Sequence, residues 1–95
     1  MSAYVIAEID VHNPELFEDY RKLVPATIAT YGGKYLVRGG ATDSKEGGWR
    51  PARMVVLEFP TMEQAKTWYH SPEYAPALAI RLKAANGKMI LVEGV

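Results

Sequence analysis

The chain has 95 residues, its 11 Lys or Arg residues are balanced by 11 Asp or Glu residues, and it contains no cysteine. This length fits one compact domain that spans residues 1–95. A balanced charge without runs of one sign excludes a typical nucleic-acid-binding protein. The lack of cysteine excludes disulfide scaffolds, thiol catalysis and thiolate metal sites, and it is compatible with the cytoplasm, where we expect the protein to reside.

The first two predicted elements are a strand and a helix. Residues 3–11 are rich in β-branched residues and place polar residues at alternate positions, which predicts a strand rather than a signal peptide or a membrane span. Asn13 is a good N-cap and Pro14 suits the first helical position, so a helix begins there. Pro25 is expected to kink or restart this helix, and the two glycines at 32–33 end it.

Two further strands are predicted at residues 34–38 and 53–59, joined by a Gly-rich segment that is too short to hold a helix. They form a hairpin with a long loop. A second helical region begins at Thr61, which forms a capping box with Gln64. It breaks at residues 71–72, resumes, and ends at Asn86-Gly87, and residues 88–92 are the last strand.

The predicted order is β-α-β-β-α-β, which is the ferredoxin-like arrangement of the α+β class: an antiparallel sheet with two helices on one face. Alternation along the strands assigns each side chain to a face. The side chains assigned to the helix side are Val5, Ala7, Ile9, Val55, Leu57 and Phe59, and those assigned to the other side are Ile6, Glu8, Leu36, Arg38, Val56, Glu58, Leu91 and Glu93. The second set is too apolar to stay in water, so we expect a homodimer that closes a dimeric α+β barrel.

Several stretches support this fold independently, namely YVIAEIDV, VPATIATYGGKYLVRGG, WRPARMVVLEFP and WYHSPEYAPALAIRLKAANGKMILVEG. Together they resemble the DUF1330 family, small bacterial proteins with a domain of unknown function; YLVRGG, WRP, LEFP and SPEY are its specific runs. The resemblance covers essentially the whole chain and implies a dimeric α+β barrel. It carries over no activity and no catalytic residue. The wider superfamily includes cofactor-independent monooxygenases, muconolactone isomerase and haem-binding proteins, whose pockets usually lie between helices and sheet.

Arg38, at the end of YLVRGG, is the most informative charged residue. With Glu58 on the same predicted face, it is expected to form an ion pair, because a charge on an apolar face is costly unless it is paired. Such a pair has two readings. It fixes strand register or dimer geometry, or it belongs to a ligand site in which Arg38 binds a carboxylate and Glu58 acts as a base.

A second group of candidate residues comes from the second helical region. Tyr74 and Arg81 are two turns apart on one stripe, and Trp68 precedes them. We expect this stripe to meet the sheet, with Trp68 and Tyr74 as walls of a pocket and Arg81 or Arg38 as its cation. The alternative is that the aromatic residues belong to the core and the dimer interface.

Other chemistries lack their sequence signals. His12 and His70 do not have the spacing of a helical metal site, no serine lies in a nucleophile elbow, and no lysine completes a P-loop, so we expect neither a metal nor a cofactor. Two functions stay open. One is binding or transformation of a small polar or aromatic metabolite, and the other is a non-catalytic homodimer in which Arg38 and Glu58 are architectural.

Overall fold

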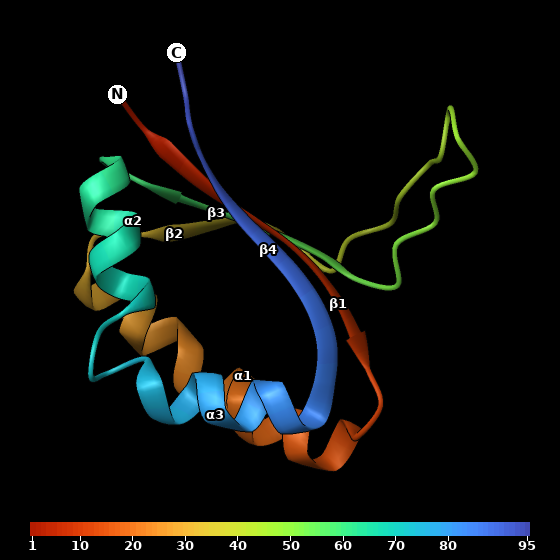
Figure 1. The fold of residues 1–95 in the computed structure, drawn as a ribbon, viewed down its shortest axis with the longest axis horizontal. Coiled ribbons are helices and arrows are strands. Elements are labelled where there is room, and N and C mark those ends of the chain that lie inside the picture. The colour runs from red at the N-terminus through yellow and green to blue at the C-terminus, as the bar shows by residue number, and fades with distance from the viewer.

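The structure is a computed structural model that describes residues 1–95. Its elements are β1 (Ala3–Val11), α1 (Pro14–Thr30), β2 (Lys34–Arg38), β3 (Met54–Phe59), α2 (Met62–Tyr69), α3 (Ala75–Ala84) and β4 (Ala85–Glu93). The strands form one antiparallel sheet in the order β2-β3-β1-β4, and the helices pack against one of its faces (Figure 1). This arrangement confirms the ferredoxin-like prediction, with the second helical region divided into two helices.

Local sequence signals set most of the helix ends. Asn13 Oδ1 accepts a hydrogen bond from the Leu16 N–H at 3.2 Å, and α1 then continues through Pro25 without a break. Between α2 and α3, the Ser71 hydroxyl donates to the Trp68 carbonyl at 2.7 Å and accepts from the Tyr74 N–H at 3.1 Å. The predicted break between the two helices is therefore fixed by a serine side chain.

The start of β4 differs from the prediction. Helix α3 ends at Ala84, and the strand begins at Ala85 instead of Lys88. Asn86 and Gly87 were expected to form the helix end, but they pair with Asp10 and Ile9 of β1. The long β1 strand offers backbone partners along this whole stretch, and these hydrogen bonds outweigh the local preference of Asn-Gly for a turn.

The helices cover only one of the two faces of the sheet. The helix side carries the core, whose largest fully buried side chains are Trp68, Tyr74, Phe59, Ile28 and Val5. We call the opposite side the open face; its residues are Tyr4, Ile6, Glu8, Lys34, Leu36, Val37, Met54, Val56, Glu58, Lys88, Ile90 and Val92. No helix of the chain covers it.

Two residues of β4 lie on the other side from the one predicted. Leu91 pairs with Val5 and Glu93 with Ala3, so both follow the helix side, and Leu91 packs against the core. Ile90 and Val92 occupy the open face instead and are 61% and 41% exposed. Both sets of alternate side chains in this strand are largely aliphatic, so the sequence pattern alone does not determine which set is buried.

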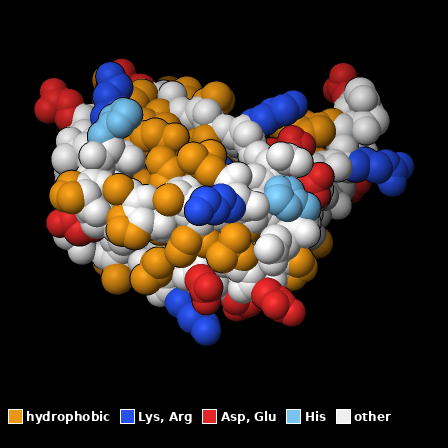
Figure 2. Space-filling model, turned by 60° about the horizontal axis from the view of Figure 1, so that its bottom comes forward, with side chains coloured by type: hydrophobic (Ala, Val, Ile, Leu, Met, Phe, Trp, Pro, Cys, Tyr) orange, Lys and Arg blue, Asp and Glu red, His pale blue; other side chains and the backbone are white.

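The segment between β2 and β3, residues 39–53, is nearly all exposed and projects from the body of the molecule (Figures 1 and 2). The indole N–H of Trp49 donates to Glu8 on the open face at 3.3 Å. On the helical side, which faces the viewer in Figure 2, hydrophobic side chains reach the surface between scattered charges. No helix is long and apolar enough to cross a membrane.

Candidate functional site

A cavity lies between α1 and the helix side of the sheet. Its floor is formed by strand residues such as Val5, Ala7 and Leu57, and α1 supplies Phe17 and Val24 above them. The cavity measures about 30 Å³, room for about two water molecules. Twelve of its 15 lining residues are hydrophobic, so its interior suits an apolar group.

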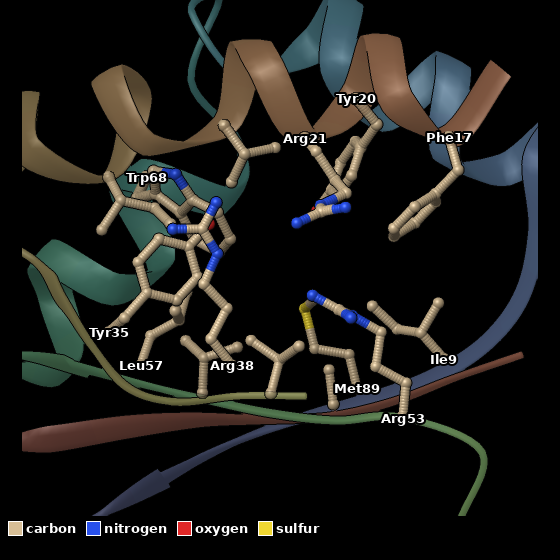
Figure 3. A pocket seen from close by; sticks show the side chains of 15 residues that line it. Ile9, Phe17, Tyr20, Arg21, Tyr35, Arg38, Arg53, Leu57, Trp68 and Met89 are labelled. Carbon is tan, nitrogen blue, oxygen red and sulfur yellow. The ribbon is translucent and has the colours of Figure 1, made fainter. Parts of the chain in front are cut away.

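The remaining three lining residues are arginines. Figure 3 shows Arg21, from α1, and Arg38 and Arg53, from the sheet side, extending their guanidinium groups into the space between the helix and the sheet. No Asp or Glu side chain lines the cavity. Arg21 pairs with Glu18 of the same helix at 2.8 Å, whereas neither Arg38 nor Arg53 has an acidic partner. The cavity is therefore apolar inside and positively charged at its rim.

Arg38 reaches this cavity because of a β-bulge. Tyr35 pairs with Leu57, but Val37 pairs with Val56, so Leu36 is an extra residue in β2. An extra residue reverses the alternation of side chains after it. Arg38 consequently lies opposite Val55, on the helix side, with its guanidinium carbon 4.6 Å from the centre of the Tyr35 ring.

The predicted ion pair between Arg38 and Glu58 is therefore wrong. Glu58 lies on the open face and pairs with Lys34 at 3.3 Å, since these two residues are opposite each other in the register. The hydrogen bond from Lys34 is the main cause that lowers the pKa of the Glu58 carboxyl group. Strand parity without the bulge had placed Arg38 and Glu58 on one face.

Arg53, like Arg21 and Tyr20, is a cavity residue that the sequence analysis did not select. Its guanidinium carbon lies 5.9 Å from the centre of the Phe17 ring, and its Nε is buried without a hydrogen-bond partner. A Cβ atom on Gly39 would lie 2.5 Å from Arg53 Nη1, so the glycine after Arg38 leaves the space that Arg53 occupies. The signal was present: Arg53 is two residues before Val55, and alternation places both on the helix side.

The three other predicted site residues come from α2, from the N-cap of α3 and from α3 itself. Trp68 lines the cavity, is 1% exposed, and donates its indole N–H to Thr27 Oγ1 at 3.1 Å. Tyr74 and Arg81 do not line it; they are 0% and 5% exposed and lie behind it. The Tyr74 hydroxyl meets the Tyr20 hydroxyl at 2.9 Å, and Tyr20 does line the cavity.

The hydroxyl groups of Tyr20 and Tyr35 keep their protons at physiological pH. Burial is the main cause that raises the pKa of Tyr20, the neighbouring Tyr74 hydroxyl raises it further, and the charge of Arg81 lowers it in part. Burial also raises the pKa of Tyr35, against the charge of Arg38. Both side chains therefore act as neutral hydrogen-bonding groups at physiological pH rather than as bases.

No side chain suited to proton abstraction lines the cavity. His12 and His70 are exposed and neither lines it. No group of three or more His, Asp or Glu side chains is arranged to hold a metal ion. The chemistry that the cavity offers is apolar contact, hydrogen bonding from tyrosine, and positive charge from arginine.

Solved structures similar to this chain share its fold. A protein of unknown function from Rhodopseudomonas palustris, RPA0582, has a TM-score of 0.75 at 14% identity, over 99% of this chain and 82% of that one. A protein from Jannaschia sp. CCS1, described as dimeric and ferredoxin-like, has a TM-score of 0.73 at 7% identity, over 99% and 100%. SnoaB from Streptomyces nogalater, a cofactor-independent oxygenase, has a TM-score of 0.67 at 14% identity, over 99% and 93%.

At the level of sequence, no curated protein matches the chain. The profile of one family does, that of the domain of unknown function DUF1330, and the match runs from residue 2 to residue 95. It spans both the strands that carry the arginines and the helices that close the cavity. The chain therefore belongs to the DUF1330 family.

Proposed function

We propose that this protein binds a small organic anion with an apolar body, in the cavity between α1 and the sheet. The observation that carries the proposal is the set of three arginines, Arg21, Arg38 and Arg53, around a cavity without an acidic side chain. Arg53 is half-buried and its Nε has no hydrogen-bond partner, which is costly unless an anion accompanies the charge. A carboxylate matches a guanidinium group with two parallel hydrogen bonds. The hydrophobic interior suits the apolar body of such a ligand in character, and the cavity of about 30 Å³ has to widen to admit it.

Entry of such a ligand requires the arginine side chains at the rim to move outward, because the cavity has room for only about two water molecules. Arg21 and Arg38 are exposed, so they can turn into solvent once the contact of Arg21 with Glu18 and that of Arg38 with the Tyr35 ring break. A carboxylate bound at the rim keeps these guanidinium groups at the mouth while the ligand body fills the space behind them. Because no histidine or carboxylate lines the cavity, binding is favoured over a reaction that starts with proton abstraction.

We further propose that the protein is a homodimer joined through the open face. Leu36 and Ile90 are 49% and 61% exposed there, and aliphatic residues of this kind over a whole sheet face mark an interface. The protein from Jannaschia sp. CCS1 with this fold is described as dimeric. The alternative of a purely architectural role for an Arg38–Glu58 pair loses its basis, since these residues lie on opposite faces.

Isothermal titration with benzoate and with the neutral benzamide tests the binding proposal. Benzoate is expected to bind, and Arg53→Met or Arg38→Met should weaken it by about 10-fold or more, because a hydrogen bond to a charged group contributes about 1.5–3 kcal/mol. Lys22→Met removes the same charge from an exposed position next to Arg21, and it should leave the affinity unchanged. Equal affinity for benzamide, or unchanged affinity in both arginine variants, contradicts the proposal.

A further inference from the structure

We infer that the ligand of this cavity is a carboxylic acid whose apolar body carries a second oxygen atom, and that the Tyr20 hydroxyl donates a hydrogen bond to this oxygen. This inference rests on the proposed function and adds to it a second recognition point. The arginines bind the anionic group at the rim. Tyr20 requires an oxygen acceptor on the apolar body of the ligand.

The first argument is the number of hydrogens in the Tyr20–Tyr74 pair. Two hydroxyl groups carry two hydrogens, and their contact at 2.9 Å uses only one of them. Neither hydroxyl has another hydrogen-bond partner in the protein, so one hydrogen lacks an acceptor. A buried donor without an acceptor is costly, and such groups in native proteins usually have a partner.

The second argument is position. Tyr74 is completely buried and does not line the cavity, whereas Tyr20 does. If Tyr74 donates to Tyr20, the remaining hydrogen belongs to Tyr20, the one residue of the pair that lines the cavity. The opposite direction leaves the hydrogen on Tyr74, where no ligand meets it. The acceptor is therefore best supplied by a molecule in the cavity.

The third argument is the charge behind this pair. Arg81 is 5% exposed, its Nε has no hydrogen-bond partner, and it forms no ion pair. Its charge acts on the Tyr20 hydroxyl. A positive charge behind a hydroxyl donor favours an oxygen that carries partial or full negative charge, such as a ketone or a phenolate oxygen. An apolar group at the same place leaves both the hydroxyl and the charge without compensation.

The inference is tested with two aromatic acids of nearly equal size, 4-acetylbenzoate and 4-isopropylbenzoate. They share the carboxylate and the ring, and they differ by a carbonyl oxygen in place of a methyl group. Wild-type protein is expected to bind the acetyl compound about 3- to 10-fold more tightly, as one hydrogen bond predicts. Tyr20→Phe should abolish this preference.

Two further variants separate recognition from stability. Tyr74→Phe leaves Tyr20 in place with its hydrogen available, so it should keep part of the preference. Tyr31→Phe removes a surface hydroxyl that donates to Glu73 at 2.6 Å, and it should leave both affinities unchanged. Equal binding of the two acids to wild type, or an intact preference in Tyr20→Phe, overturns the inference while the proposed function stands. If neither acid binds, both are overturned.

Discussion

The two faces of the sheet differ in whether their charged side chains are paired. On the open face, each cation lies opposite an anion in the strand register: Lys34 opposite Glu58, and Lys88 opposite Glu8. On the helix side, Arg38 and Arg53 lie among apolar side chains without an acidic partner. The charges of these pairs on the open face therefore balance and the rest of the face is largely apolar, as expected for a surface that meets a second copy of itself. The helix side has an excess of positive charge, as expected for a site that receives an anion.

One residue creates much of this difference. Without the bulge at Leu36, Arg38 would lie on the open face, beside residues whose charges already balance. With the bulge, Leu36 and Val37 both turn to the open face, where they are 49% and 38% exposed, and Arg38 turns to the cavity. The bulge therefore adds apolar surface to one face and positive charge to the other. Bulges often redirect a side chain in this way near functional sites.

The largest effect is expected from a charge placed in the middle of the open face. Val56 pairs with Ile6 and Val37, so Val56→Glu puts a carboxylate at the centre of the proposed dimer interface. We expect the dimer to weaken by on the order of 3 kcal/mol, more than 100-fold in dissociation constant, because this charge has no partner. Light scattering at micromolar concentration, with thermal unfolding of the same samples, measures both consequences.

A matched control for this experiment is Ala79→Glu, which adds the same charge at an exposed position of α3. It should leave the mass in solution unchanged. A monomeric wild-type protein, or a Val56→Glu variant that remains dimeric, would show that the open face does not join two copies.

The helix side predicts a dependence of stability on pH. Burial raises the pKa of Tyr20 above 10.0, so above that pH the unfolded chain releases the proton and the folded chain keeps it. The free energy of unfolding should therefore fall with rising pH above 10.0, and Tyr20 contributes about 1.4 kcal/mol per pH unit to the slope. Urea unfolding at several alkaline pH values measures it. Tyr20→Phe should reduce the slope, and identical slopes in variant and wild type contradict the assignment.

The order of the elements was predictable from the sequence, because each signal is local. Asn13 and Thr61 cap the helices that follow them, and Ser71 separates α2 from α3. The faces of β1 and β3 were also predictable, since in both strands one alternate set is mostly apolar and the other carries charge. The fold depends on these periodicities, so its prediction was confirmed.

The site was less predictable, because it depends on a register change that no local signal announces. YLVRGG has the composition of a regular strand end, and the extra residue becomes visible only when β2 pairs with β3. Arg38 was therefore selected correctly as an unusual residue but placed on the wrong face. Arg53 lay inside the predicted strand at residues 53–59, so the alternation that placed Val55 on the helix side also applied to it, yet it was not selected as a site residue. The partner of Tyr20 required contact between α1 and the start of α3, which sequence spacing does not give.

The smallest effect is expected at the two glycines that follow Arg38. Gly39 has φ +70, and a Cβ atom added to it would lie 2.5 Å from Arg53 Nη1. A Cβ atom added to Gly40 would have no other atom within 4 Å. Gly39→Ala should cost roughly 1–2 kcal/mol through the left-handed backbone and should displace Arg53, which weakens benzoate binding as Arg53→Met does. Gly40→Ala should change neither quantity. In the double variant Gly39→Ala with Arg53→Met, the loss of affinity should not exceed that of Arg53→Met alone, because both changes remove the same contact. Additive losses in a titration of the four proteins would show that Gly39 acts on the cavity by another route.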